Sequence, residues 1–430
     1  MILDAYLSDP ETEDLISDRA LVAAMLAVEA ALARVQGRLG IIPGEAAVRI
    51  TDTAHGLEVD IAALSAATVR DGVPVIEFLG QLRRAVGAPH DGYVHWGATS
   101  QDIMDTAMNL MLAEVLALFL DRLDNLIGTW APLAARHRAT IMAARTRNQQ
   151  AVPTTFGLKV AGWIASLLRH RQSLAHIGLK VQFGGAGGTL SALGSRGPEV
   201  AAALAEELHL AAPLMPWHNQ REAMVDVANW LSGVSGTLGR SAGDILLLAQ
   251  TEVGEVKLRG GGGSSTMPQK ANPVLAEAVL ALARRNAGLI GAMHQAAVHL
   301  GERDGAAWIL EWLTLPDMIR TSGAGLRHGL EMARNLEVYV DRMTANMSPA
   351  LLAERAVYAL AEHMPKSEAQ ALVKAANGAA SVEATADRDL FDLLAETTDA
   401  PLDWPALRDP ATYIGAAGHF IDTVLKEIKS

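Results

Sequence analysis

Apolar side chains recur every three or four residues along much of the chain, which is the spacing of one face of an α-helix. The clearest stripe follows Trp230 and consists of Leu231, Val234, Leu238, Ala242, Ile245, Ala249, Val253 and Val256. A helix over residues 230–258 would be about 40 Å long at the usual rise per residue. Similar stripes occupy residues 102–137, 155–180 and 273–299. Together they predict an all-α protein in which long helices pack side by side.

Glycine and proline residues mark where helices should end. Beyond about residue 335 the stripes are short again, so we expect short helices there. The interruptions that divide the preceding part of the chain are Asp71-Gly72 and residues 88–92, 184–188 and 260–265.

The composition indicates a folded protein with a large core, since 50% of the 430 residues are hydrophobic. The 36 basic residues against 48 acidic ones give a formal net charge of −12, which argues against nucleic-acid binding. The same charge is compatible with a local basic site for an anionic small molecule. There is no cysteine, so disulfides, thiol catalysis and cysteine-type zinc sites are excluded.

Targeting signals and metal motifs are not evident in the sequence. The first twenty residues are rich in Asp and Glu and lack the basic start and apolar run of a secretory signal. The apolar run over residues 108–120 contains Glu114 and is too short to span a bilayer. No spacing of the His-Glu-x-x-His kind occurs. We therefore expect a cytoplasmic protein with no metal, no cofactor and no membrane partner.

The most informative segment is residues 260–273, Gly-Gly-Gly-Gly-Ser-Ser-Thr-Met-Pro-Gln-Lys-Ala-Asn-Pro. By composition alone it would be a flexible linker. A linker does not need Met267-Pro268, or a lysine, an asparagine and a proline at this spacing. The segment does not fit a phosphate loop, because the residue directly before Lys270 is not Gly and the residue directly after it is not Ser or Thr.

Two further polar segments carry candidate chemistry. Residues 95–106 place a Thr-Ser-Gln-Asp sequence before a predicted helix, where Ser100 or Asp102 could cap the helix. The backbone N–H groups of such a helix start are also a favourable place for a carboxylate. Residues 145–157 contain Arg147 and Gln150 ahead of Ala-Val-Pro-Thr-Thr-Phe-Gly.

The three segments resemble signature stretches of the fumarase/aspartase superfamily. Residues 263–273 match every fixed position of Gly-Ser-Ser-x-Met-Pro-x-Lys-x-Asn-Pro, and residues 95–102 match His-x-Gly-x-Thr-Ser-x-Asp. Residues 146–157 are similar to Thr-His-x-x-x-Ala-x-Pro-Thr-Thr-x-Gly. The resemblance extends over nearly the whole chain and is weakest in the first 80 residues.

The resemblance implies a three-domain architecture and a shared active site. The expected domains are an N-terminal helical domain over residues 1–95, a central long-helix bundle over residues 96–335 and a C-terminal helical domain over residues 336–430. It also implies a homotetramer in which each active site is built from three chains.

The resemblance further implies the roles of the residues in the glycine-rich loop. Ser264 matches the catalytic base of the family, with a turn hydroxyl as the alternative. A serine is a weak base unless its alkoxide is stabilised, which Lys270, Asn272 and backbone N–H groups could provide. The reaction that the resemblance implies adds or removes a proton at the carbon next to a carboxylate. It passes through a doubly charged aci-carboxylate, and fixed donors and cations stabilise such charge best.

Substrate binding is expected from a second group of residues. Thr99, Ser100 and Gln101 would bind carboxylate oxygens, and Gln220 matches a substrate-contacting glutamine of the family. His95 is either a ligand of the substrate or a satisfied histidine at a helix end. Arg303 is either a substrate contact or a surface arginine. His294 and His299 lie on a periodic stripe and are expected to be structural.

Arg147 and Gln150 stand where many members of the family have histidines. Arginine stays protonated at working pH and is a poor proton shuttle. Its planar fork suits a carboxylate bound by two hydrogen bonds. We therefore expect Arg147 to orient a substrate carboxylate, the alternative being a surface arginine near a helix start. The general acid stays unassigned.

Within the superfamily, the sequence is most similar to bacterial 3-carboxy-cis,cis-muconate cycloisomerases. This implies closure of a carboxymuconolactone by carboxylate addition to a double bond and protonation of the α-carbon. Alternatives are a 3-sulfomuconate substrate, a lyase that releases fumarate from a succinyl-type substrate, and a non-enzymatic crystallin-like protein. The supporting stretches are residues 181–189, 216–221, 302–303, 308–316 and 409–415.

Overall fold

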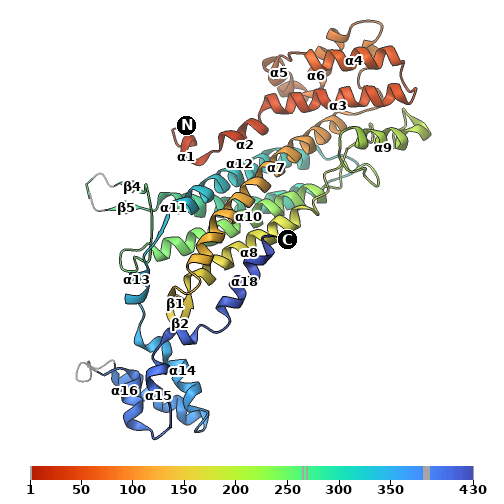
Figure 1. The fold of residues 1–430 in the computed structure, drawn as a ribbon. Coiled ribbons are helices and arrows are strands. Elements are labelled where there is room, and N and C mark those ends of the chain that lie inside the picture. Colours follow the sequence, from red (N-terminus) through yellow and green to blue (C-terminus); the bar gives the residue numbers. More distant parts are fainter. Residues whose placement is uncertain (1, 264–265, 268–269, 381–387, 430) are drawn as a thin grey trace. The chain divides into compact units, whose positions relative to one another are not determined.

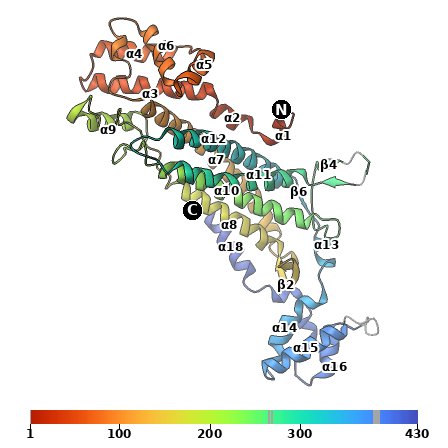
Figure 2. The same cartoon turned by 180° about the vertical axis from the view of Figure 1, so that it is seen from behind.

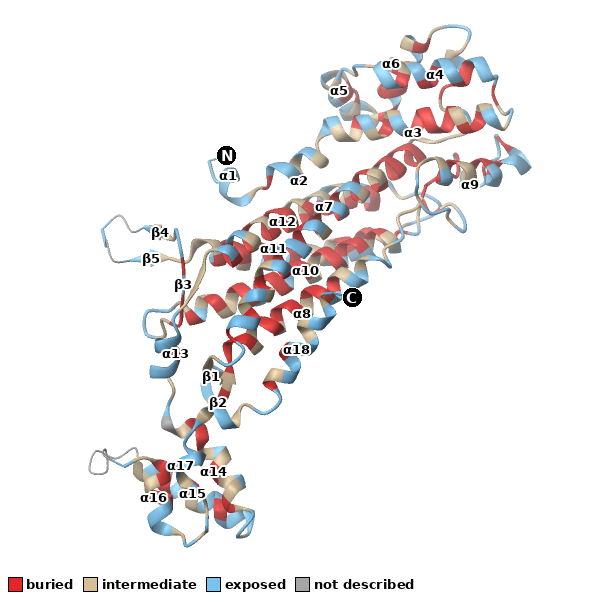
Figure 3. Ribbon diagram, in the orientation of Figure 1, coloured by how far each residue is buried: buried red, intermediate tan, exposed pale blue. Residues whose placement is uncertain are grey.

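The computed structural model describes residues 2–263, 266–267, 270–380 and 388–429. The chain forms two compact units. The first consists of Met1–Leu123, His170–Gly239 and Ala278–Arg327, and the second of Asp124–Arg169, Arg240–Glu277 and His328–Ser430. Long helices with buried faces contribute to both units (Figures 1 and 3). The expected all-α class is confirmed, with short strands confined to hairpins and loop ends.

The long helices follow the apolar stripes. They are α7 (Ser100–Arg136), α8 (Phe156–Leu174), α10 (Glu222–Leu248), α11 (Val274–Ala296) and α12 (Gly305–Arg334). The predicted helices over residues 102–137, 155–180 and 273–299 are confirmed, although α8 and α11 end earlier than expected. The stripe analysis did not single out α12, which continues through Pro316.

The helix predicted over residues 230–258 is wrong at both ends. It begins at Glu222 and ends at Leu248, and the chain then turns at Gly254, which has a φ of 60°. Strand β3 (Val256–Leu258) follows and pairs antiparallel with β6 (Leu336–Val338). Val256 extended the apolar stripe because it is a buried strand residue, and its spacing from the helix happened to fit a helical repeat.

Helix α7 corrects one expectation. It is long and apolar enough to cross a membrane by length and composition, although residues 108–120 alone looked too short. Of its most apolar stretch, 61% is buried inside the structure. A buried core helix passes the same test, so this is weak evidence for a membrane span.

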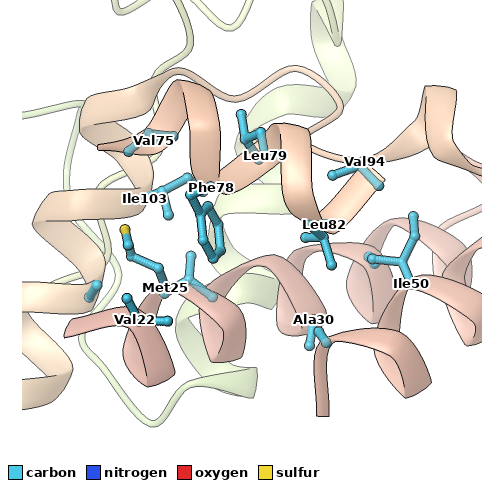
Figure 4. Packing of buried hydrophobic residues seen from close by; sticks show 14 of the residues in the cluster. Val22, Met25, Ala30, Ile50, Val75, Phe78, Leu79, Leu82, Val94 and Ile103 are labelled. Carbon is cyan, nitrogen blue, oxygen red and sulfur yellow. The ribbon is translucent and has the colours of Figure 1, made fainter. Parts of the chain in front are cut away.

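Shorter helices form the first part of the first unit. They are α1 (Asp4–Leu7), α2 (Pro10–Leu15), α3 (Asp18–Arg38), α4 (Gly44–Gly56), α5 (Ile61–Asp71), α6 (Val75–Val86) and the 3₁₀ turn η1 (Asp91–Tyr93). As predicted, α5 ends before Gly72, which takes the left-handed conformation. Phe78 and Leu82 of α6 pack with Met25 of α3, Ile50 of α4 and Ile103 of α7 (Figure 4). This core fixes α3 relative to the start of α7.

A second cluster in the same unit joins α3 to α9 (Gly197–Glu207), which follows the 3₁₀ turn η2 (Gly194–Arg196). Leu32 and Val35 of α3 belong to the same buried cluster as Val200 and Leu204 of α9 and Phe183 of the preceding glycine-rich loop. The loop that contains residues 184–188 is thereby held close to α3.

Two hairpins in the second unit carry residues of the polar motifs at 145–157 and 260–273. Strand β1 (Ile141–Thr146) pairs antiparallel with β2 (Gln149–Thr155). Strand β4 (Gly262–Gly263) pairs with β5 (Ala271–Asn272). These pairings show that the described ends of the glycine-rich segment form a hairpin and not a linker.

The last part of the second unit consists of short helices, as predicted. They are α13 (Val340–Ala345), η3 (Pro349–Leu352), α14 (Ala353–Leu360), α15 (Lys366–Ala380), α16 (Leu390–Thr397), α17 (Trp404–Leu407), η5 (Pro410–Tyr413) and α18 (Ala417–Glu427). Helices α14, α15 and α16 gather around a buried cluster that includes Leu360, Val373 and Phe391 (Figures 1 and 2).

Candidate active site

The first turn of α7 is organised around the buried carboxylate of Asp102. The Oδ1 atom accepts hydrogen bonds from Gly184 N (2.9 Å) and His218 Nε2 (2.7 Å). The Oδ2 atom accepts from Gly185 N (2.9 Å) and from Thr99 N (3.0 Å). The last of these bonds confirms that Asp102 caps α7. One carboxylate therefore joins the helix start, the glycine loop and the segment around His218.

Arg303, Gln101 and Thr99, which were candidate substrate contacts from the sequence, lie together beside Asp102. Arg303 Nε donates to Gln101 Oε1 at 2.8 Å, and Arg303 Nη1 lies 3.4 Å from Thr99 Oγ1. Gln101 Nε2 donates to the carbonyl of His218 at 2.9 Å. Among the described residues no carboxylate pairs with Arg303, whose charge is therefore available to an anion. Ser100 begins α7, so its N–H belongs to the helix start.

Asp304 fixes the loop that carries Arg303. Its Oδ1 atom accepts from Ala306 N and Ala307 N, and its Oδ2 atom accepts from Leu300 N. These backbone hydrogen bonds hold the pKa of the Asp304 carboxyl below its usual range. Since Asp304 occupies the free N–H groups of the first turn of α12, Arg303 remains the group that this loop presents to a ligand.

His95 lies in the loop before α7 with a positive φ of 67°. Its Nδ1 atom lies 2.6 Å from Glu29 Oε1, and the two side chains are 11% and 1% exposed. The histidine is therefore bonded on one ring nitrogen. Glu29 was not predicted from the sequence, because a single glutamate on the apolar face of α3 belongs to no motif.

Gln220 is exposed, and its side-chain nitrogen lies 3.5 Å from Met215 Sδ. The next residue, Arg221, is fully buried and was not predicted. Its guanidinium donates to Asp105 at 2.7 and 3.1 Å and to Glu311 at 2.9 and 2.5 Å. His218 and Arg221 thus bind Asp102 and Asp105 of α7 at matching three-residue spacings. This double attachment fixes the backbone on either side of Gln220.

The buried Arg221 cluster perturbs the pKa values of its members. Burial opposes the charge of Arg221, but the two carboxylates outweigh it and raise the pKa of the guanidinium. Burial raises the pKa of the Glu311 carboxyl above its usual value, against the effect of Arg221. Trp308 donates its indole N–H to Asp105, so this side chain is part of the buried cluster. His299 lies beyond the end of α11, which corrects its expected place on a helix, and burial lowers its pKa.

In the second unit, Arg147 lies at the tip of the hairpin of β1 and β2. Arg147 and Asn148 both have positive φ, 51° and 63°, between the paired residues Thr146 and Gln149. This is a two-residue hairpin turn of the I′ kind. The side chain of Arg147 is exposed and makes no hydrogen bond or ion pair with the described residues. Arg147 is therefore a surface arginine, as the alternative had it, but it lies in a hairpin turn and not near a helix start.

Gln150 and Arg145 tie this hairpin to the rest of the second unit. Gln150 Nε2 donates to the carbonyl of Asn346 at 2.7 Å, and Gln150 Oε1 accepts from Ser348 N at 3.0 Å. Arg145 donates to the fully buried Glu255 through Nη1 and Nη2, at 3.0 and 2.5 Å. Neither side chain is a proton shuttle, because the amide of Gln150 does not ionise and the guanidinium of Arg145 stays protonated.

The glycine-rich hairpin presents Lys270 and Asn272. Asn272 is opposite Gly262 in the pairing of β4 and β5, and a Cβ atom at Gly261 would lie 2.7 Å from the Asn272 carbonyl. Lys270 is exposed just before β5, and its N–H donates to the carbonyl of Met267. The predicted base Ser264 lies outside the described residues.

The structure thus brings together part of the predicted site. Thr99, Gln101 and Arg303 form one hydrogen-bonded group in the first unit. Arg147, Lys270 and Asn272 belong to the second unit. Among the described residues, no group of three His, Asp or Glu side chains is arranged to hold a metal ion.

Comparison with known proteins identifies the class. A family profile described as lyase matches residues 22–288, and the chain belongs to this family, within the fumarase/aspartase superfamily. The chain is similar to the 3-carboxy-cis,cis-muconate cycloisomerase of Pseudomonas aeruginosa, at 39% identity over 99% of this chain and 96% of that protein. It is 36% identical to the nitrosuccinate lyase of Streptomyces davaonensis, over 98% and 94% of the two chains. The crystal structure of the 3-carboxy-cis,cis-muconate lactonizing enzyme from Pseudomonas putida matches with a TM-score of 0.91 and 36% identity, covering 100% of this chain and 99% of that chain.

Proposed function

We propose that the chain is a cycloisomerase that converts 3-carboxy-cis,cis-muconate into a carboxymuconolactone, a step of aromatic-compound catabolism. The observation that carries the proposal is similarity at 39% identity along 99% of the chain to a protein of that name. The arrangement of the first unit supports a polycarboxylate substrate, because Arg303 is held by Gln101 and Thr99 and lacks a carboxylate partner among the described residues.

In the proposed reaction, a carboxylate oxygen of the substrate adds to the β-carbon of a double bond and closes the lactone. The α-carbon takes up one proton, which solvent ultimately replaces. We assign the Ser264 hydroxyl as the donor in this direction, and its alkoxide as the base in the reverse direction. Negative charge accumulates on the carboxylate next to the α-carbon, and we assign Lys270 and Asn272 to stabilise it.

The remaining predicted residues would hold the other carboxylates. We assign Thr99, Ser100, Gln101, Gln220 and Arg303 to one end of the substrate and Arg147 to another. His95 would contribute through its second ring nitrogen. A planar guanidinium binds a carboxylate through two parallel hydrogen bonds, which fixes the plane of that carboxylate as well as its position.

The test is turnover of 3-carboxy-cis,cis-muconate, followed as a change in ultraviolet absorbance. We expect saturable turnover by the wild-type chain and none by Ser264→Ala prepared in the same way. A second candidate function is a lyase reaction on a succinyl-type substrate, favoured by the similarity to nitrosuccinate lyase. Release of fumarate from such a substrate, with no change of 3-carboxymuconate, would reject the cycloisomerase. A parallel assay with 3-sulfomuconate distinguishes a 3-sulfomuconate cycloisomerase from a 3-carboxymuconate cycloisomerase.

We also propose a homotetramer whose active sites combine three chains. Large apolar side chains exposed on one face of α12, Ile309 at 48% and Leu313 at 69%, support burial against further copies. Mixing inactive Ser264→Ala with an inactive Gln101→Ala variant and reassembling should restore part of the activity. Absence of recovery in verified mixed tetramers would contradict the shared site.

The expected domain boundaries and localisation are retained as proposals. The start of α7 at Ser100 and the end of α12 at Arg334 support boundaries near residues 95 and 335. Limited proteolysis at these two positions tests the boundaries. Cell fractionation tests the expected cytoplasmic location.

A further inference from the structure

Glu29 is a buried carboxylate that neither the proposed mechanism nor the motifs use. It lies on α3 between Val28 and Ala30, and all three residues are 1% exposed. A carboxylate in such surroundings is costly unless hydrogen-bond donors satisfy it. Its Oε1 atom is bonded to His95 Nδ1, while its Oε2 atom is buried and has no partner among the described residues. Glu29 thus has one described donor, and that donor belongs to the candidate site.

Helix α3 holds the loop of His95 at two points. Glu29 contacts the imidazole ring, and two helical turns later the side chain of Gln36 donates to the carbonyl of Trp96 at 2.8 Å. The loop needs such support, because His95 has a positive φ that residues with a side chain rarely adopt. The ring and the backbone of the loop are therefore fixed from the same helix.

The contact also determines which edge of the ring is available. An ionised carboxylate can only accept a hydrogen bond, so the histidine tautomer that fits this contact donates from Nδ1. Nε2 makes no hydrogen bond with the described residues. A carboxylate that orients an imidazole in this way is a common device for fixing the ring nitrogen that meets a ligand.

We propose that Glu29 is a positioning residue of the candidate active site, which holds the His95 ring so that Nε2 meets a carboxylate of the substrate. This inference rests on the proposed function. It adds a residue from the N-terminal helices to the site, and it explains why an acidic side chain stands within the apolar face of α3.

The experiment is a double-mutant cycle of Glu29→Ala and His95→Ala in the full-length protein. We expect Glu29→Ala to raise KM by about tenfold, the usual scale for a residue that orients a ligand-binding histidine, with kcat much less affected. In the His95→Ala background the same substitution should change kcat/KM by less than about twofold, because the imidazole ring through which Glu29 acts is then absent. Glu29→Gln can still accept a hydrogen bond from Nδ1, so its KM should lie close to that of the wild type.

The matched control is Asp9→Asn, which neutralises another buried carboxylate of the first unit. Asp9 is 2% exposed and binds Arg122, away from the loop of His95. It should lower the midpoint of unfolding and leave KM unchanged. If Glu29→Ala fails to fold, Glu29→Asp is used in the same cycle, since it withdraws the carboxylate from Nδ1 by one methylene.

An equal loss of kcat/KM with and without His95 would overturn the inference, as would a control that raises KM to the same extent. Failure of the proposed function is distinguishable, because the wild-type chain would then not turn over 3-carboxymuconate. In that case urea unfolding of the four proteins of the cycle decides the inference, since it needs no substrate. Additive changes in the unfolding free energy would then reject Glu29 and His95 as one unit.

Discussion

In the first unit, the carboxylate of Asp102 accepts four hydrogen bonds and Arg303 is held by Gln101. In the second unit, the side chains of Arg147 and Lys270 are exposed and make no hydrogen bond with the described residues. The first group is fixed before a ligand arrives, and donors arranged in advance need little reorganisation. The second group consists of long cations that lose side-chain entropy when they bind. The first unit thus holds a polar group fixed by hydrogen bonds, Arg303 included, whereas the described cations of the second unit are exposed and unfixed.

The largest expected effect is loss of turnover when the proposed proton donor, Ser264, is replaced. Ser264→Ala removes the proposed proton donor and should lower kcat by about 10³-fold or more, at the upper part of the range for proton-transfer residues. Substrate binding should persist, because the cationic and amide contacts remain. Steady-state assays and equilibrium dialysis measure the two quantities. Activity within about tenfold of wild type would remove Ser264 from this role.

The next effect breaks the fixed geometry of the first group. Asp102→Asn cannot accept all four hydrogen bonds, and buried donors left without a partner cost about 1–3 kcal/mol each before relaxation. We expect a loss of about 3 kcal/mol in unfolding free energy and about 100-fold in kcat/KM. Urea unfolding and steady-state kinetics are the measurements.

The control for Asp102 is Asp244→Asn in the second unit. Asp244 binds Lys159 and Trp163 and is 27% exposed. This variant should cost less stability and leave kcat/KM within about twofold, as expected for a partly exposed ion pair. Equal catalytic losses in the two variants would mean that Asp102 stabilises the fold without organising a site.

Arg147→Lys sharpens the comparison, because it keeps the charge of the second group and removes the planar fork. Arginine and lysine would both adopt the same backbone conformation at this position, with a φ of 51°, so the free energy of unfolding should not change. We expect kcat/KM to fall about tenfold through loss of one of two hydrogen bonds to a carboxylate. Kinetics across pH give the answer, and a lysine variant equal to wild type would leave Arg147 without a role in the site.

The smallest effect concerns pH and the buried Arg221 cluster. Burial holds the pKa of Glu311 above its usual value of 4.5. A carboxyl with a raised pKa in the folded state stabilises that state only while protonated, so its contribution is lost as pH rises above 4.5. Glu311→Gln cannot ionise and should gain stability relative to wild type as pH rises. Unfolding midpoints measured from about pH 4 to about pH 8 test this, and parallel curves would contradict it.

Much of the fold follows from the apolar stripes, because long helices must bury one face wherever they pack. The stripe beyond Leu248 misled, since a strand residue at Val256 continued the helical spacing by coincidence. The hairpin around Arg147 was missed because its turn lacks the Asn-Gly or Asp-Gly pair that signals such turns.

The candidate site likewise contains residues that the sequence predicted and residues that it did not. Thr99, Gln101 and Arg303 were predicted because they lie in or beside recognisable motifs. Glu29 and Glu255 were not, because each is a single acidic residue far along the chain from the group that it binds. Only the folded chain brings such partners together, and no local pattern identifies them beforehand.

The hairpin turn at Arg147 and Asn148 connects the thermal stability of the chain with the substrate-binding role that we propose for Arg147. The left-handed conformation costs most residues with a side chain about 1–2 kcal/mol, and asparagine adopts it more readily, so the larger part of the cost in this turn falls on Arg147. A laboratory evolution experiment that selects only for survival at high temperature should recover Arg147→Gly, since glycine relieves the backbone and nothing in that selection preserves the guanidinium. A selection that also demands turnover of 3-carboxy-cis,cis-muconate, the substrate that we propose, should relieve the same turn through Asn148→Gly.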